Sequence, residues 1–355
     1  MFKRRQRGIS IRQQQQHPDE RRQRGHGSSH SGQPSRRKNN TTLSPRRRTQ
    51  DSRQEEQQGN QTEWEAYCSR LTEERVLKCG LTFVNYNKNQ QERVKIETNI
   101  NRFRSHYGVG HKAITAMIKD LPPQDKFVLY DLFMALSFAK NYNTEIVHAS
   151  NWGVCSDKVD NRVKHYFKLM QSLKSKKIFI GTFTKNTIYA YSVDGVHSRT
   201  KESRKTPTRK VYSHKFHGPG VAYEVGMAIN ENRILWSKGP FKASTNDVKM
   251  FNMKDTGAFH PDMPQGKKGI ADSSYSHLKE HITVHRVGHS KEMTNFINRV
   301  RARHENIYSR LKVWDVLSDV FRGSWEKHNE HKMYFEGCLV LLQYDMENGH
   351  PLMEV

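Results

Sequence analysis

Residues 187–200, TIYAYSVDGVHSRT, mark the point where the chain changes from helical to strand-like patterning. Their β-branched and aromatic residues partly alternate with polar ones, which is typical of a strand. Two segments of the same texture follow, GPGVAYEVGMAI (218–229) and ILWSKGPF (234–241), separated by glycine, proline and asparagine. Such breaks favour a meander of antiparallel strands.

The segments after this meander add helices and one more strand. Residues 246–253 are the size of a short helix, and residues 266–275 predict a short strand that ends in an acid. Residues 290–321 predict one long helix or two, capped by Ser290. The order β-β-β-α-β-α predicts an α/β fold in which a mixed sheet is flanked by helices.

The chain before residue 186 is patterned for helices. Apolar residues recur three and four positions apart in residues 64–84 and 127–140. Residues 144–173 then predict a short helix opened by Thr144, a glycine-containing turn and a second helix capped by Ser156. This order is typical of a helix-turn-helix motif, although an ordinary pair of packed helices gives the same pattern. The candidate DNA-binding residues on its outer face are Lys158, Arg162, Lys164, His165 and Lys168.

Residues 1–60 differ in composition from the rest of the chain. They hold 15 Lys or Arg against five Asp or Glu, a net charge of +10, and the other +14 of the total +24 lies beyond them. With so few apolar residues, this segment is expected to be a disordered basic tail. We therefore expect three regions: the tail (1–60), a helical region with the helix-turn-helix-like segment (61–185) and an α/β domain (186–355).

The charge surplus favours a polyanionic partner, most commonly nucleic acid. Two basic clusters in the tail fit nuclear-localisation signals or phosphate contacts, although a plain solvated charge run is equally consistent with them. No apolar run approaches the roughly 20 residues that span a membrane, and no secretory h-region is found at the N-terminus. The four scattered cysteines favour reduced thiols over a disulfide framework or a cysteine-rich zinc site. We expect a nuclear protein.

Three acids are candidate metal ligands. Asp194 and Asp272 each follow a predicted strand beside a small residue, and the α/β rule places ligands in the crevice at that edge of the sheet. Glu305 shares one sector of the predicted helix with Arg301 and Lys312, so a helix laid on the sheet brings it towards the aspartates. Each acid also has an ordinary structural interpretation. Either aspartate could cap a turn, and Glu305 could form an ion pair with Arg301 four residues earlier.

Three converging carboxylates repel each other unless a cation neutralises them. Hard oxygen ligands select Mg²⁺ or Mn²⁺ over zinc. Two such ions about 4 Å apart activate a water and stabilise the leaving oxygen during attack on a phosphodiester. The sequence therefore predicts phosphodiester chemistry at these acids.

The residues around these acids resemble the PIF/Harbinger superfamily of transposase-derived nucleases, whose DDE domain has an RNase H-like fold. The likeness covers residues 100–355 or so and omits the tail. The family's motif around its first acid is similar to VDGVH (193–197), and the motif around its second acid is similar to ADSSY (271–275). Arg301, Glu305 and Lys312 have the same spacing as the Arg, Glu and Lys of the family's third motif. Residues 209–215, 242–247 and 331–352 also resemble segments of the family. This sequence departs from the family's pattern at Val196, Asn246, Ala271 and Ser274. A copy that has lost its catalytic activity therefore remains an alternative.

The resemblance implies a DNA endonuclease and transposase that cleaves transposon ends and joins them to target DNA. Asp194, Asp272 and Glu305 would be its catalytic and metal-binding residues, with two Mg²⁺ or Mn²⁺ ions. Asp247 is a rival for the middle acid, ranked lower because a predicted helix begins there and makes it a candidate N-cap. Arg301, Lys312 and His197 would support the site or contact phosphate.

The resemblance further implies DNA as the partner and a separate Myb-like protein that reads the element ends, while the oligomeric state stays open. Two other functions stay open as well. One is a domesticated, catalytically inactive protein that binds DNA or another partner. The other is an RNase H-like enzyme that acts on RNA.

Overall fold

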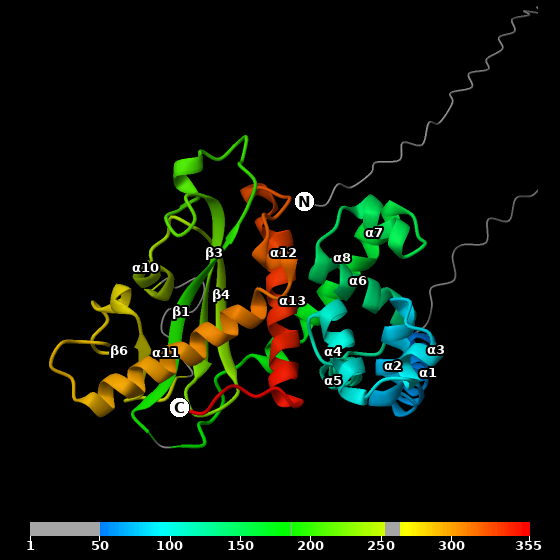
Figure 1. Cartoon of the computed structure of the whole chain (residues 1–355), viewed down its shortest axis with the longest axis horizontal. Coiled ribbons are helices and arrows are strands. Elements are labelled where there is room, and N and C mark those ends of the chain that lie inside the picture. Colours follow the sequence, from blue (N-terminus) through cyan, green and yellow to red (C-terminus); the bar gives the residue numbers. More distant parts are fainter. Residues whose placement is uncertain (1–49, 186, 253–262) are drawn as a thin grey trace, which may run out of the picture. The chain divides into compact units, whose positions relative to one another are not determined.

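The computed structural model describes residues 50–185, 187–252 and 263–355 (Figure 1). Residues Gln50–Val355 form one compact unit. The disorder predicted for residues 1–49 lies outside the described residues, whereas residues 50–60 belong to helix α1, Gln50–Ser69. This helix is rich in Gln and Glu, which are good helix formers, and Trp64 in its second half is buried against Phe127. The helical region thus begins ten residues or so earlier than predicted.

The predicted helices 64–84 and 127–140 are present in altered form. The first is divided, because the Thr72 hydroxyl accepts the N–H of Arg75 and starts a new helix. The second is α6, which follows the proline pair at residues 122–123. The remaining helices before the sheet are α2 Glu73–Phe83, α3 Lys88–Glu92, α4 Ile96–Tyr107, α5 His111–Asp120, α6 Leu129–Asn141, α7 Glu145–Asn151, α8 Ser156–Ser172 and α9 Lys174–Lys177.

Helices α7 and α8 form the predicted helix–turn–helix pair. The Thr144 hydroxyl caps α7 by accepting the N–H of Val147 at 3.4 Å, and Gly153 takes a left-handed φ of 58° in the turn. The N-cap of α8 is Cys155, so Ser156 is its first helical residue and the cap prediction was off by one position. The predicted stripe of α8 is buried: Val159, Val163, Tyr166 and Met170.

The sheet is mixed, as the sequence predicted. Its main strands run in the order β4–β3–β1–β5–β6, with β2 paired to the start of β3. The first three form an antiparallel meander, and β5 and β6 run parallel to β1. This mixed sheet flanked by helices is consistent with an RNase H-like α/β fold. The strands are β1 Tyr189–Arg199, β2 Tyr212–Ser213, β3 Gly218–Ala228, β4 Ile234–Lys242, β5 Lys268–Ala271 and β6 Ile282–Val284.

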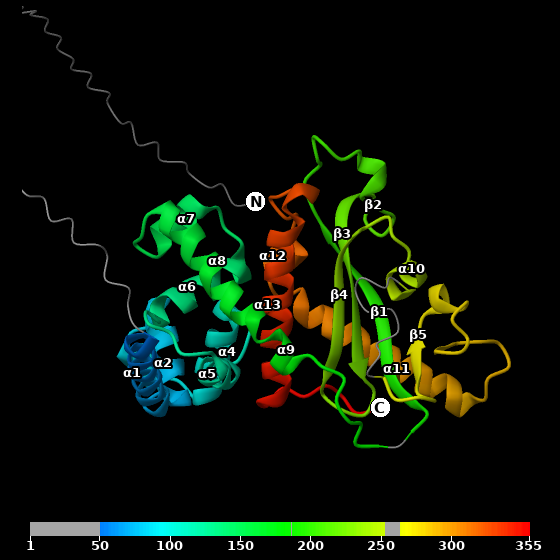
Figure 2. The same ribbon diagram turned by 180° about the vertical axis from the view of Figure 1, so that it is seen from behind.

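The helices of this part cover both faces of the sheet. Helix α11 crosses the face turned to the viewer in Figure 1, and the strands lie in front of it in Figure 2. Its Ile297 and Val300 pack on Ile270 of β5, and Ser290 caps it as predicted. The predicted helical stretch 290–321 is two helices. The elements are α10 Asp247–Asn252, α11 Lys291–Leu311, α12 Asp315–Ser318 and α13 His328–Glu347, with short 3₁₀ turns η1 Thr208–Lys210, η3 Ser273–Tyr275 and η4 Trp325–Lys327.

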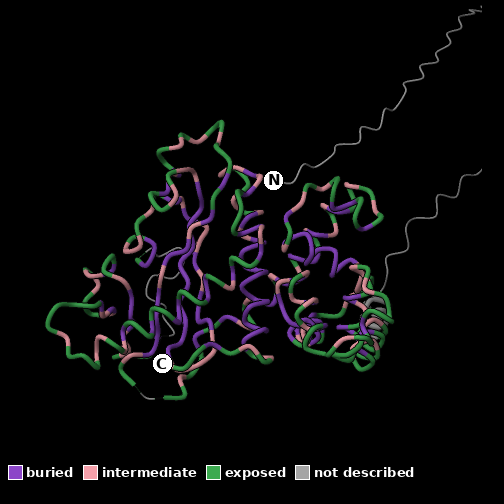
Figure 3. The backbone as a smooth tube through the Cα atoms, in the orientation of Figure 1, coloured by how far each residue is buried: buried purple, intermediate pink, exposed green. Residues whose placement is uncertain are grey.

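Helix α13 joins the helical region to the sheet. It is buried along most of its length (Figure 3) and contacts α5 and α8 as well as β4. Arg104 of α4 donates two 2.8 Å hydrogen bonds to Asp345, and Lys174 of α9 pairs with Glu336 at 2.6 Å. A helix that is apolar all round needs partners on every side. Consequently, the regions before and after residue 186 share one core.

None of the described helices has the length and apolar composition needed to cross a membrane.

Candidate active site

Asp194 lies in the middle of β1, because the strand continues to Arg199 and pairs with β3 along this half. The prediction that it ends a strand was therefore wrong. Pairing with β5 does stop at Ser192 and Ile270, two residues before Asp194 and Asp272 respectively. Because side chains alternate along a strand, Asp194 lies on the same sheet face as Ser192, whose hydroxyl lies 2.8 Å from His304 of α11.

The surroundings of Asp194 disfavour its ionised form. Burial raises the pKa of its carboxyl to about 6, and the charges of Asp272 and Asp247 push in the same direction. The nearby Lys215 ammonium and the Gly195 N–H, 2.7 Å from Oδ1, oppose this rise. A carboxylate in this position gains from a cation placed beside it.

Asp272 follows the last residue of β5, as predicted, and caps η3. Its Oδ1 accepts the Ser274 N–H at 2.9 Å and lies 2.5 Å from the Ser274 hydroxyl. The same hydroxyl lies 2.8 Å from Oδ2 of Asp247. Ser274 thus bridges the two candidates for the middle acid.

Asp247 begins α10 but does not cap it. The cap is Asn246, whose side-chain oxygen accepts the Lys249 N–H at 2.8 Å, so the reason for ranking Asp247 lower was wrong. Its carboxylate lies against Gly195, where a Cβ would come within 2.6 Å of Oδ1. Asp194, Asp247 and Asp272 are hereafter the acidic cluster.

Glu305 lies on the exposed side of α11, one turn before Tyr308. The Tyr308 hydroxyl donates to the Asp194 carbonyl oxygen at 2.6 Å, which fixes this part of α11 beside β1. Within the described residues, no hydrogen bond or ion pair joins the Glu305 side chain to the acidic cluster or to Arg301. The same residues contain no group of three or more His, Cys, Asp or Glu placed to hold a metal ion. The predicted three-acid constellation is thus only partly assembled.

A cavity of about 410 Å³ opens beside Asp194 between β1, α11 and α12. Lys312 and His197 line it, as expected of supporting residues, whereas Arg301 is exposed on α11 and does not. Burial and the Lys215 charge lower the pKa of His197 to about 4, so its ring is neutral near pH 7. Its Nδ1 lies 2.8 Å from the Ser213 hydroxyl, which orients the ring.

Lys215 also lines this cavity, and the sequence did not single it out. Its Nζ donates to the Gly195 carbonyl oxygen at 2.9 Å and its charge acts on Asp194. The only signal in the sequence was its place in the basic stretch 209–215. The contact depends on a turn that brings the chain back to β1, which a local pattern cannot predict.

A buried ion pair lies on β3 and β4 beside Gly195. Glu224, opposite Gly195 in the β1–β3 register, pairs with Lys238 at 3.3 Å and accepts the Trp236 indole N–H at 3.1 Å. Both charged side chains are almost fully buried. Burial raises the pKa of the Glu224 carboxyl, and Lys238 opposes the rise. The sequence shows both charges within apolar strands but does not show that they meet.

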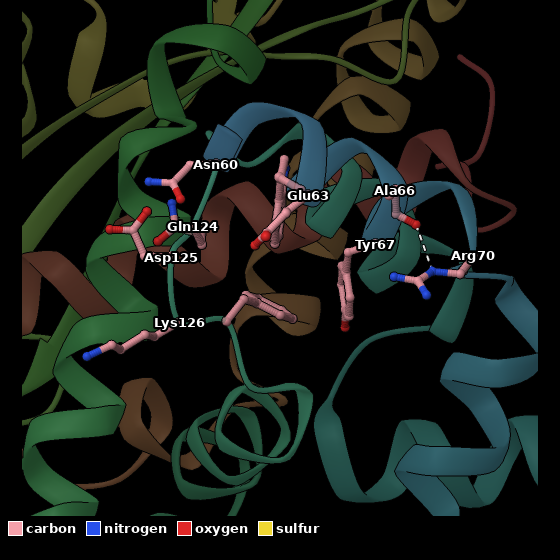
Figure 4. A pocket seen from close by; sticks show the side chains of 10 residues that line it. Asn60, Glu63, Ala66, Tyr67, Arg70, Gln124, Asp125 and Lys126 are labelled. Atoms are coloured by element: carbon pink, nitrogen blue, oxygen red, sulfur yellow. Dashed lines mark hydrogen bonds between the residues drawn. The ribbon is translucent and has the colours of Figure 1, made fainter. Parts of the chain in front are cut away.

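A second cavity, of about 460 Å³, lies in the helical region between α1 and residues 124–127 (Figure 4). The rings of Trp64, Tyr67 and Phe127 in its lining pack against one another with centroids 5.3 to 5.6 Å apart. It contains no member of the acidic cluster. The cavity beside Asp194 is therefore the candidate active site.

The five candidate DNA-binding residues of α8 are not equivalent. Arg162 forms a 2.6 Å ion pair with Asp131, and Lys164 forms a 2.8 Å ion pair with Asp160. These two cations have partners within the protein. Lys158, His165 and Lys168 are exposed and form no ion pair in the part of the chain that the structure describes. Three of the five are thus available for a phosphate.

Residues 193–343 match the family model described as DDE superfamily endonuclease. The matched segment begins one residue before Asp194 and includes the acidic cluster, α11 and most of α13. The match supports a transposase-derived nuclease domain in this part of the chain, and it does not distinguish the PIF/Harbinger superfamily from others. No curated protein and no solved structure matches the chain.

Proposed function

We propose that the chain is a metal-dependent DNA endonuclease and transposase of the PIF/Harbinger type. The observation that carries the proposal is that Asp194 of β1, held beside α11 by Tyr308, lies near Asp272, which follows the neighbouring strand β5 and whose charge acts on Asp194. Both lie within the segment that matches the DDE superfamily endonuclease family. Asp194 and Asp272, with Glu305, would hold Mg²⁺ or Mn²⁺.

Asp194 and Asp272 have the donor chemistry of a divalent-cation site, which Glu305 would have to join from α11. Burial raises the pKa of Asp194 to about 6, and the charges of Asp272 and Asp247 add to the rise. Carboxylate oxygens are ligands that Mg²⁺ and Mn²⁺ prefer. When bound, such a cation supplies Lewis acidity and lowers the pKa of a water. Glu305 would complete the ligand set from the neighbouring helix.

The reaction has two steps of the same kind. A water attacks phosphorus at the element end, the bond from phosphorus to the 3′-oxygen breaks, and that oxygen takes a proton to become a free 3′-hydroxyl. The 3′-oxygen of this hydroxyl then attacks phosphorus in the target, the bond from that phosphorus to the target's own 3′-oxygen breaks, and the departing 3′-oxygen takes the proton that the attacking hydroxyl gives up. Lys215 and Lys312, at the rim of the cavity, would contact the phosphate oxygens.

We expect millimolar Mn²⁺ to raise the melting temperature of the full chain by about 2–4 °C at pH 7.5 and not at pH 5. The raised pKa, about 6 against an ordinary 3.8, means that the metal-free fold favours protonated Asp194. The stabilisation that the folded state gains by binding this proton is present in full below pH 3.8. It is lost as the pH rises through about 6. A proton and a cation therefore compete for this carboxylate. Differential scanning fluorimetry measures the melting temperature. If Mn²⁺ raises the melting temperature of Asp194→Asn by the same amount, the cation binds at another site.

We expect Glu305→Gln to lower metal-dependent nicking by about 100-fold and to change DNA affinity less than twofold. The amide keeps the shape of the side chain but removes the charge that a metal needs. Glu292→Gln is the matched control, because Glu292 is in the first turn of the same helix, far from Tyr308. Nicking of a supercoiled plasmid that carries terminal inverted repeats measures both variants. Parent-like nicking by Glu305→Gln would remove it from the site.

The alternative is a domesticated protein that binds DNA or another partner without turnover. The incomplete ligand set favours it, because Glu305 does not contact the acidic cluster in the described structure. It predicts salt-sensitive DNA binding by the parent with no nicking in Mg²⁺ or Mn²⁺. Faster cleavage of RNA or a hybrid than of duplex DNA would instead indicate an RNase H-like enzyme. The basic clusters of residues 1–60 support nuclear localisation, and the family resemblance supports a Myb-like partner.

A further inference from the structure

The segment between β1 and β3 is strongly basic. Residues 199–217, hereafter the basic arm, contain seven Lys or Arg and a single acid, Glu202. All seven cations are exposed. Figure 1 shows the arm in green, projecting beyond the end of β3 near α12. The cations are Arg199, Lys201, Arg204, Lys205, Arg209, Lys210 and Lys215.

The backbone of the basic arm is fixed by hydrogen bonds. Near its start, the Lys201 N–H donates to the carbonyl oxygens of Phe321 and Gly323 at 3.2 and 3.1 Å. In its middle, Glu326 of η4 accepts the hydroxyls of Ser203 and Thr206, and these bonds lower the pKa of the Glu326 carboxyl. Near its end, the Ser244 hydroxyl donates to the Lys210 carbonyl oxygen at 2.5 Å. The arm therefore presents its cations from a defined backbone.

The cations of the arm lack acidic partners. None of the seven forms an ion pair within residues 50–185, 187–252 and 263–355. The comparably basic helix α9 behaves differently: Lys174 pairs with Glu336, Lys176 with Asp120, and Lys177 with Glu347. Positive charge that the fold neutralises in α9 is left uncompensated in the arm. Uncompensated like charge on one surface attracts a polyanion.

The two ends of the arm enter the candidate active site. Arg199, Lys215 and Phe216 line the cavity beside Asp194, together with Lys312 of the α11 C-cap. The Arg199 guanidinium lies 5.4 Å from the centre of the Phe216 ring, which holds it at the mouth of the cavity. Exposed cations therefore extend from the acidic cluster onto the arm.

We propose that the basic arm binds the phosphate backbone of duplex DNA and leads it to the acidic cluster. Arg199 and Lys215 contact phosphates next to the scissile one, and Arg204, Lys205, Arg209 and Lys210 contact phosphates further along the duplex. The contacts go to phosphates and carry no sequence information. The inference rests on the proposed function for its substrate, and its test is a binding measurement that needs no cleavage.

The test compares two variants of the full chain with the same loss of charge. The arm variant carries Arg204→Gln, Lys205→Gln, Arg209→Gln and Lys210→Gln. The control variant carries Arg70→Gln, Arg93→Gln, Lys95→Gln and Lys126→Gln, four exposed cations of the helical region. Affinity for a 30-base-pair duplex is measured by fluorescence anisotropy without divalent metal, as a function of salt. Each phosphate contact contributes about 0.9 to the slope of log K against log salt.

We expect the slope of the arm variant to fall by about 3 and that of the control by less than 1. Equal decreases in both variants would overturn the proposal, since only overall charge would then matter. Arm-dependent binding that strongly prefers duplex RNA would overturn DNA as the ligand. A parent that binds DNA through the arm but never nicks it would refute the proposed function and leave the arm intact.

A second measurement does not depend on folding of the variants. Amine-reactive labelling of the parent, read by mass spectrometry, reports which lysines DNA covers. We expect Lys205 and Lys210 to be protected by duplex DNA, and Lys95 and Lys126 to stay reactive. Unprotected arm lysines at saturating DNA would also overturn the proposal.

Discussion

Asp194→Asn is expected to lower metal-dependent nicking by about 1,000-fold or more. Asp194 is the member of the acidic cluster whose backbone contacts α11 through Tyr308 and whose side chain opens onto the candidate active site. The amide preserves the volume of the side chain but cannot hold a cation. Plasmid nicking in Mg²⁺ and in Mn²⁺ gives the rate, and anisotropy gives DNA affinity, which we expect to stay within about twofold.

Unfolding would not explain the loss of nicking, because Asp194→Asn is expected to stabilise the metal-free protein. The pKa of Asp194 is raised from 3.8 to about 6, so the ionised carboxylate costs up to about 3 kcal/mol in the fold at pH 7.5. An uncharged side chain avoids that cost, and Asp194→Asn should melt at a higher temperature than the parent. Asp125→Asn, an exposed aspartate of the helical region, is the control. If Asp194→Asn nicks at the parental rate, the chain is not a DDE nuclease.

The same assay separates the two candidates for the middle acid. Asp272→Asn should match Asp194→Asn in effect, because Asp272 directly follows β5, the strand beside β1, and its charge acts on Asp194. Asp247→Asn should have a smaller effect, since its carboxylate reaches Asp272 only through the Ser274 hydroxyl. The reverse order would assign Asp247 as the metal ligand.

Lys238→Met is expected to lower the free energy of unfolding by about 3–5 kcal/mol at pH 8. The substitution leaves Glu224 buried without its 3.3 Å partner. The loss should be smaller at pH 5, because the pKa of Glu224 is already raised by burial and a protonated carboxyl needs no counter-charge. Urea denaturation followed by circular dichroism measures the midpoint at each pH.

Two further variants show whether the buried charge is the cause. Glu224→Gln added to Lys238→Met should restore part of the lost stability, because it removes the unpaired charge. Lys164→Met breaks a half-exposed pair with Asp160 and should cost less than about 1 kcal/mol. A Lys238→Met protein as stable as Lys164→Met would mean that Glu224 is neutral in the parent.

Much of the fold followed from short-range pattern. The alternation in residues 187–241 predicted the antiparallel meander, and the apolar spacing after Ser290 predicted α11, because each depends only on neighbours within a few residues. Errors arose where long-range pairing acts. β1 extends past Asp194 because β3 continues to pair with it. The core that the helical region shares with the sheet likewise depends on α13, which packs against both.

The candidate metal ligands show the same division. Sequence alone determined that Asp194, Asp272 and Glu305 each occur in a recognisable local setting, since a motif spans only five to twelve residues or so. Only the tertiary structure decided which acids come together. It brought Asp247 to Asp272 through Ser274, placed Lys215 beside Asp194 and left Glu305 on the neighbouring helix without a contact to the cluster. These relations depend on strand register and helix packing across tens of residues, which no local pattern specifies.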